Sequence, residues 1–131
     1  MEILQIEGSW KSPHIILDPN GNFEIWGRSL PENVIDIYTP VLEWLDAYVK
    51  KAAPQTNIEV KLEYFNTSSS KLLYEIFKRF ENIKKAGNNI NVKWYFESDD
   101  ADLEEDGKMF ADLVNVPIEM VSVEEFEFTF Q

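Results

Sequence analysis

The sequence predicts a single α/β domain that combines a mixed β-sheet, an N-terminal β-hairpin and several helices. Its 131 residues fall within the range of about 100–150 that is most common for one domain. Hydrophobic residues make up 44% of the chain, which is enough for one ordinary core. Segments of strand-like alternation are followed by segments of helical periodicity, as in α/β proteins. We therefore interpret residues 1–131 as one domain.

The first part of the chain is predicted to form three short strands. Apolar patches occur at 3–6, 14–17 and 23–26, and the last two are separated by Asp18-Pro19-Asn20-Gly21-Asn22, a strong turn signal. The following Ser29-Leu30-Pro31-Glu32 resembles a helix start, because a serine precedes a glutamate by three residues. We expect Pro40 to kink this helix or to begin a second one.

The middle of the chain alternates strands with helices. Residues 58–64 and 90–96 alternate apolar with polar side chains, which indicates strands with one buried face. A helical stripe covers residues 72–83, and a third helix is predicted for about 100–114, followed by a strand at 118–123. The third helix is expected to bury Leu103, Met109, Phe110, Leu113 and Val114. This order predicts parallel crossovers behind the hairpin.

The end of the chain leaves two structural alternatives open. Phe126, Phe128 and Phe130 alternate with Glu127 and Thr129. Such alternation is typical of a strand, so residues 123–131 are predicted to form either an edge strand or a loosely held tail.

Charge and composition exclude several functions. The 12 basic and 24 acidic residues give a formal net charge of −12, which would repel nucleic acid and anionic membranes. The chain has no cysteine and one histidine, which excludes thiolate and His-rich metal sites, and no cofactor is expected. It also lacks a signal-peptide pattern and an apolar stretch of about 20 residues. We expect a cytoplasmic protein.

Two further features have plain structural interpretations. The acidic run at 97–106 suggests calcium, but counting an EF-hand from Asp100 places Glu105 at position six and Ala111 at position twelve, where glycine and glutamate are required. Acidic residues at a helix start are the simpler explanation. His14 is not accompanied by a Gly-x-Ser-x-Gly motif, so it is interpreted as structural and no catalytic residue is predicted.

The segment Asn66–Ser70 has the clearest functional potential. It follows a predicted buried strand, precedes a predicted helix and contains four consecutive hydroxyls, more than one helix cap requires. A helix N-terminus has free N–H groups and a positive dipole end, so it would accommodate a phosphate. Spacing alone, however, favours an ordinary helix cap with small polar neighbours.

Several segments resemble the SiaC-type regulatory phosphoproteins of bacteria, from about residue 3 to residue 121. These are Lys11-Ser12-Pro13, Gly27–Asn33, Glu63–Lys71 and Trp94-Tyr95-Phe96. Leu30 stands where the family often has tyrosine, which is a conservative change. The resemblance implies a STAS-like (SpoIIAA-like) fold, similar to that of the anti-sigma-factor antagonists.

The resemblance also implies a function without catalysis. In SiaC-type proteins the threonine of the Asn-Thr-Ser-Ser motif, here Thr67, is phosphorylated by a dedicated serine/threonine kinase and dephosphorylated by a PP2C-type phosphatase. The unmodified form is expected to activate a diguanylate cyclase and so to promote aggregation or biofilm. Residues expected around the phosphosite are Asn66, Ser68, Ser69, Lys71 and Arg28. Alternatives are an anti-sigma-factor antagonist acting on transcription, a constitutive scaffold, or a small enzyme using a serine at 68–70.

Overall fold

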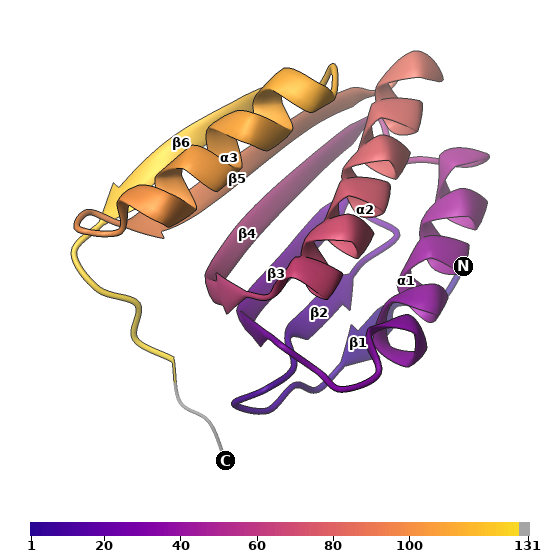
Figure 1. Cartoon of the computed structure of the whole chain (residues 1–131). Helices are drawn as coiled ribbons and strands as arrows, with labels where there is room; N and C mark the ends of the chain where they lie inside the picture. Colours follow the sequence, from indigo (N-terminus) through magenta and orange to yellow (C-terminus); the bar gives the residue numbers. More distant parts are fainter. Residues whose placement is uncertain (129–131) are drawn as a thin grey trace.

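The computed structural model describes residues 1–128, which form one mixed six-stranded sheet with three helices on one of its faces (Figure 1). The order of the strands in the sheet is their order in the chain. The strands are β1 (Leu4–Ile6), β2 (His14–Leu17), β3 (Asn22–Ser29), β4 (Gln55–Phe65), β5 (Asn89–Glu97) and β6 (Ile118–Val123). The first three strands are antiparallel, and β3 to β6 are parallel.

The helices connect the parallel strands. They are α1 (Val34–Val49), α2 (Thr67–Lys85) and α3 (Ala101–Leu113). Each crossover leads to the next strand in the same direction, and right-handed crossovers of this kind place their helices on one face of the sheet (Figure 1). This architecture confirms the predicted mixed α/β sheet with its N-terminal hairpin. Within residues 1–128, no helix is both long and apolar enough to cross a membrane.

The core lies between the helices and the sheet. Alternate strand residues such as Ile25, Val60 and Trp94 are buried against the helices, as the period-two pattern predicted. Phe77 of α2 stacks on Phe110 of α3 at 4.9 Å between ring centroids and fills the space above β5. The other residues of the same strands form an open sheet face that carries many charged side chains.

The predicted start of the first helix is wrong. Ser29 is the last residue of β3, because its backbone continues the ladder with β4 opposite Phe65. Its side chain is fully buried. Helix α1 begins at Val34 instead, and the side chain of Asn33 caps it by accepting a hydrogen bond from the N–H of Asp36 at 3.3 Å. The helix continues through Pro40 without a second start.

The third helix is confirmed, but two of its expected core residues are wrong. Met109 and Leu113 are 39% and 51% exposed. The buried stripe passes through Leu103, Gly107 and Phe110 instead, because Gly107 packs directly on the indole of Trp94. A helix without a side chain at this position can approach β5 closely, which turns Met109 and Leu113 toward solvent.

The described part of the C-terminal tail forms no edge strand. Residues 124–128 have no regular secondary structure. Instead, the ring of Phe128 lies 5.1 Å from the ring of Trp26, which projects from the open face of β3. The alternation expected to continue through Phe130 lies partly outside the described residues.

Candidate functional site

The start of α2 is fixed by Asn66, which lies between the end of β4 and the helix. Its extended backbone ends the strand, and its side-chain oxygen accepts a hydrogen bond from the N–H of Ser69 at 2.8 Å. Its own N–H donates to the carbonyl of Ser29 at the end of β3. Asn66 is therefore the helix cap, so none of the four following hydroxyls is needed for capping.

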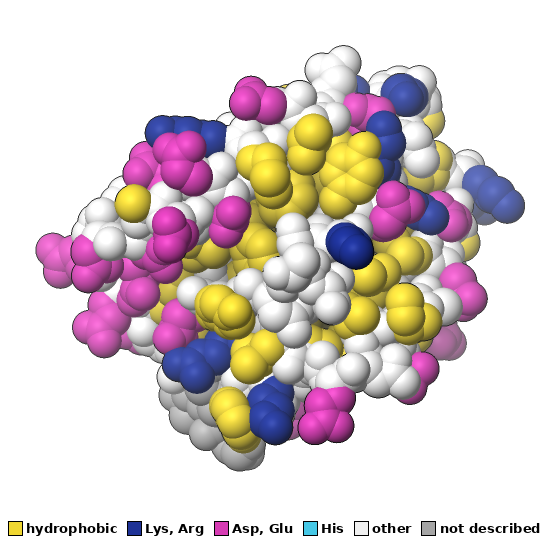
Figure 2. All heavy atoms as spheres, viewed as in Figure 1, with side chains coloured by type: hydrophobic (Ala, Val, Ile, Leu, Met, Phe, Trp, Pro, Cys, Tyr) yellow, Lys and Arg dark blue, Asp and Glu magenta, His cyan; other side chains and the backbone are white. Residues whose placement is uncertain are grey.

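The four hydroxyls of residues 67–70 lie in different environments. Thr67 and Ser68 are exposed, Ser70 is half-buried, and Ser69 is completely buried. Another protein can therefore reach Thr67 and Ser68 in the folded state. Figure 2 shows this region at the centre of the helix-covered face as mainly uncharged polar surface, whereas acidic side chains gather over α3.

A buried chain of hydroxyls lies directly behind this exposed pair. The Ser69 hydroxyl donates to the backbone carbonyl of Ser29 at 2.9 Å, and the Ser29 hydroxyl donates to the Ser69 oxygen at 2.8 Å. The Tyr38 hydroxyl of α1 lies 2.5 Å from the Ser29 oxygen. Since Ser29 uses its own hydrogen toward Ser69, Tyr38 donates to Ser29. These three hydrogen-bonded hydroxyls thus connect β3, α1 and α2.

Burial keeps this chain of hydroxyls neutral. Desolvation raises the pKa of Tyr38 to about 12. The sequence analysis missed the roles of Ser29 and Tyr38, because Ser29 matched a helix cap and Tyr38 belonged to an ordinary apolar stripe. Their pairing with Ser69 arises from contacts between segments that are distant in the chain.

The first turn of α2 is suited to negative charge. Among residues 1–128, the N–H groups of Thr67 and Ser68 have no hydrogen-bond acceptor, as is usual in a first helical turn. Residues 67–70 include no acid, and Lys71 is exposed one turn beyond Thr67. The positive end of the helix dipole lies at the same place.

Arg28 lies on the other side of the sheet from this helix start. It precedes Ser29 in β3, so the two side chains point to opposite faces. Its guanidinium forms an ion pair with Glu63 of β4 at 2.8 Å, and this hydrogen bond and charge raise the pKa of Arg28. The structure therefore brings Thr67, Ser68 and Lys71 to one helix end, while Arg28 belongs to the open face.

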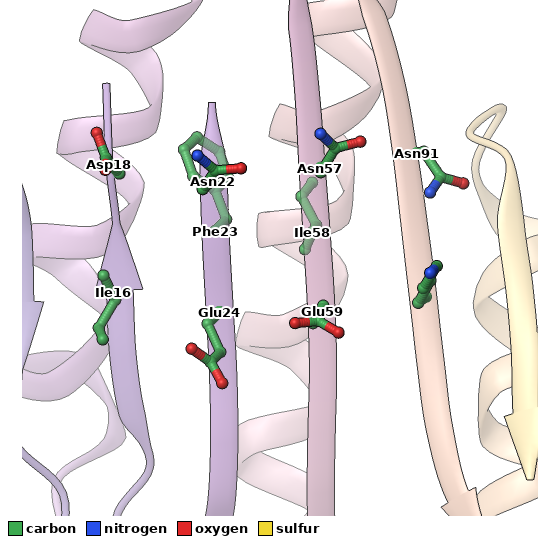
Figure 3. A pocket seen from close by; sticks show the side chains of 10 residues that line it. Ile16, Asp18, Asn22, Phe23, Glu24, Asn57, Ile58, Glu59 and Asn91 are labelled. Carbon is green, nitrogen blue, oxygen red and sulfur yellow. The ribbon is translucent and has the colours of Figure 1, made fainter. Parts of the chain in front are cut away.

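A shallow hollow of about 290 Å³ is also present, on the open face (Figure 3). Asn22, Asn57 and Asn91 form a row across β3, β4 and β5, with Glu24 and Glu59 in the next row (Figure 3). In the part of the chain that the structure describes, no group of three His, Cys, Asp or Glu side chains is arranged to hold a metal ion. This hollow faces away from α2, so it is separate from the exposed hydroxyls.

The other two features considered in the sequence have structural roles. Asp100 caps α3 by accepting a hydrogen bond from the N–H of Leu103 at 3.0 Å, and Asp102 and Glu104 lie in its first turn. His14 stacks on Trp26 with 3.8 Å between ring centroids, and its Nδ1 accepts a hydrogen bond from the N–H of Gly8. Both observations agree with the plain interpretations of these residues.

The fold presents exposed hydroxyls at the β4–α2 junction, and the comparisons place the chain in a class of regulatory proteins. The chain belongs to the SiaC family of regulatory phosphoproteins, whose family model matches residues 6–123. This match confirms the resemblance seen in the sequence. An uncharacterized protein of Pseudomonas aeruginosa strain UCBPP-PA14 is 26% identical over 98 residues, which are 74% of this chain and 78% of that protein.

Solved structures of SiaC from Pseudomonas aeruginosa have the same fold. One aligns with a TM-score of 0.84 and 24% identity, covering 94% of this chain and 100% of that chain. A chain from the crystal structure of the diguanylate cyclase SiaD in complex with its activator SiaC aligns with a TM-score of 0.84 and 23% identity, covering 92% of this chain and 99% of that chain.

Proposed function

We propose that this chain is a phosphorylation-switched regulator in which Thr67 is modified and whose unmodified form binds and activates a diguanylate cyclase. Membership of a family of regulatory phosphoproteins supports the switch. The structurally similar SiaC is described as the activator of the diguanylate cyclase SiaD, which supports the kind of partner. The observation that carries the proposal is the exposure of Thr67 at the capped start of α2.

The environment of the hydroxyls favours Thr67 over Ser69 as the modified residue. A kinase must bring the hydroxyl to its γ-phosphate, and the Ser69 hydroxyl is buried with both its donor and acceptor functions in use. Ser68 is exposed as well, but the motif resemblance assigns the family's threonine to Thr67. A cognate serine/threonine kinase would add the phosphate, and a PP2C-type phosphatase would remove it.

A phosphate on Thr67 would alter the surface without unfolding the helix. It adds a charge of about −1.5 to −2, and the free N–H groups of Thr67 and Ser68 are available to it. Asn66 would still cap the helix. A partner that docks on this helix end would have to desolvate the new charge, at several kcal/mol without a matching cation. Since about 1.4 kcal/mol changes affinity tenfold, this suffices for an on/off switch.

Phosphorylation is tested by incubating the protein with its cognate kinase and ATP and by locating the added mass through fragmentation. We expect one phosphate on Thr67 in the wild type and in Ser68→Ala, and none in Thr67→Ala. Phosphate confined to Ser68 would move the site by one residue. An unmodified protein with every cognate kinase would contradict the switch and favour a constitutive scaffold.

The partner is tested by measuring binding to the cyclase and its rate of cyclic-di-GMP synthesis. We expect the unmodified chain to raise the rate, and phosphorylation or Thr67→Glu to weaken binding at least tenfold. The glutamine of Thr67→Gln has the same length as the glutamate of Thr67→Glu but carries no charge, so this variant should bind like the wild type. Equal binding of the cyclase by Thr67→Glu and by the wild type would exclude the added charge as the cause of the switch. Capture of an anti-sigma factor instead of the cyclase would favour control of transcription.

A further inference from the structure

The described part of the C-terminal tail is held against the open sheet face by specific contacts. The backbone N–H of Phe126 donates to the carboxylate of Glu97, at the end of β5, across 2.9 Å. The rings of Phe126 and Phe128 stack with 5.0 Å between centroids and 15° between planes. Figure 1 shows this segment, in yellow, leaving the end of β6 and running past the end of β4. Residues 124–128 are therefore a packed segment.

This segment contacts Trp26, a large aromatic residue on a face that carries many charged side chains. Phe128 lies 5.1 Å from Trp26 between ring centroids, and His14 stacks on the same indole at 3.8 Å. An indole on an uncovered sheet face would expose a large apolar area to water. Phe128 removes part of that area from solvent and is itself half-buried by the contact.

The lysine beside this contact is paired with acidic residues of the sheet. The ammonium of Lys61 lies 3.9 Å from Glu24 and 3.8 Å from Glu59, and 5.0 Å from the ring centre of Tyr95. The hydroxyl of Tyr95 donates to Glu59 at 2.6 Å. Lys61 is thus paired within the sheet, and the contacts that the tail makes include the Phe128–Trp26 ring contact and the Phe126–Glu97 hydrogen bond.

The segment fills the open face incompletely and leaves space beside it. A hollow of about 410 Å³ lies between Trp26, Lys61 and Phe128, and another of about 300 Å³ lies between Lys61, Tyr95 and Phe126. Both hollows are bounded on one side by the sheet and on the other by the tail. The tail therefore crosses a surface wide enough for an extended segment.

The tail lies outside the part of the chain that matches the family. The family model ends at residue 123, and the whole of one SiaC structure is covered by 94% of this chain. The sheet that carries Trp26 belongs to the shared fold, whereas its cover comes from the additional segment. The face around Trp26 therefore lies within the region that matches the family, and the segment that occupies it lies outside that region.

We propose that the open face around Trp26 is a docking surface for an extended segment in which two phenylalanines alternate with glutamates, and that residues 124–128 are its resident ligand in cis. A partner that uses this face must carry similar aromatic residues and must displace the tail. The tail thus competes with such a partner for the open face around Trp26. The proposal concerns the face opposite α2, so its test is independent of phosphorylation at Thr67.

The occupancy of the face is tested by NMR of full-length protein labelled with ¹⁵N in its tryptophan indoles, with the Trp26 signal assigned through Trp26→Phe. We expect Phe126→Ala/Phe128→Ala to shift the Trp26 signal and to leave those of the buried Trp94 and of Trp44 in place. Glu125→Gln/Glu127→Gln alters two exposed tail residues and should leave all signals unchanged. Phe128→Ala alone serves as the second variant should the double one fold poorly.

Competition is tested with a synthetic peptide of residues 121–128. The peptide should return the Trp26 signal of the double variant toward its wild-type position. A short tether gives an effective concentration of about 1 mM, so a peptide that binds the uncovered face at about 0.1 mM should bind the wild type roughly tenfold more weakly. A peptide with both phenylalanines replaced by serine should not bind.

Two results would overturn the proposal. One is an identical Trp26 signal in the wild type, in the double variant and in Phe128→Ala, which would mean that the tail does not occupy the face. The other is equal peptide affinity for the wild type and the double variant, which would mean that the tail does not compete.

Discussion

The hydroxyl of Ser69, at the start of α2, donates a hydrogen bond to the backbone carbonyl of Ser29, at the end of β3, across 2.9 Å. The two residues are 40 positions apart in the chain. Together with the N–H of Asn66, which donates to the same carbonyl, this contact fixes the first turn of α2 against the sheet. The exposed hydroxyl of Thr67 is therefore presented from a rigid base.

Replacing Ser69 by alanine should destabilise the domain. The substitution leaves the buried hydroxyl of Ser29 without its acceptor, a loss that typically costs about 1–3 kcal/mol. Urea unfolding at neutral pH measures the change. Ser68→Ala is the matched control, because an exposed serine usually changes stability by less than about 0.5 kcal/mol. Equal stability of the two variants would show that the buried chain of hydroxyls is not stabilising.

Replacing Asn66 by alanine should loosen the start of α2. The N–H of Ser69 loses its acceptor, and loss of a helix cap costs about 0.5–2 kcal/mol. Asn66→Asp keeps an oxygen at the same place and should retain most of the stability. Amide hydrogen exchange of residues 68–70 measures the local effect. Unchanged exchange rates in Asn66→Ala would contradict the capping role.

A methyl group at position 107 should disrupt the packing of α3 on β5. The added carbon would lie 2.6 Å from Cδ1 of Trp94 and 2.8 Å from the methyl of Met120, well inside contact distance. Overpacking of this kind costs about 1–3 kcal/mol. Thermal unfolding of Gly107→Ala measures it, with the exposed Glu105→Ala as control. A melting temperature equal to that of the wild type would mean that α3 can shift away from β5 without loss of stability.

Glu81 should make stability depend on pH. Hydrogen bonds from the N–H of Asn115 and from Lys85, with Lys78 nearby, lower the pKa of this 9%-exposed carboxylate from 4.5 to about 2. Its stabilisation is therefore complete above pH 4.5 and is lost as the pH falls through the folded pKa near 2.

The corresponding variant is Glu81→Gln. It should be less stable than the wild type at pH 7, by on the order of 2–3 kcal/mol, and the difference should shrink between pH 4.5 and 2. Urea unfolding across this range measures both proteins. A difference that stays constant down to pH 2 would show that the charge of Glu81 is not the cause.

Local patterns predicted the elements of this fold well. The alternation in β4 and β5 identified the buried side of each strand, because every second side chain must point the same way. The strand–helix junction at Asn66 was predicted from the apolar strand and the polar run that follows it. The family motif then distinguished Thr67 from its neighbours, and its modification stays a prediction.

The predictions that the structure contradicts depend on contacts between segments that are distant in the chain. Ser29 fitted a helix cap by its neighbours, but its ladder with β4 kept it in a strand. Met109 looked like a core residue until Gly107 allowed α3 to approach Trp94. The alternating tail suggested a strand, whereas contact with Trp26 on another strand placed Phe128 on the open face.

The agreement between strand order and chain order has a consequence for how the protein is made. Among the described strands, each one pairs with the strand synthesised just before it, so the sheet can grow at one edge while the chain leaves the ribosome. Each addition closes only the loop of one intervening connection. Residues 124–128 emerge after all of these strands, so the part of the Trp26 indole that Phe128 contacts stays uncovered until then, although His14 already stacks on the ring. A nascent chain would therefore expose the part of this indole that Phe128 covers in the folded molecule.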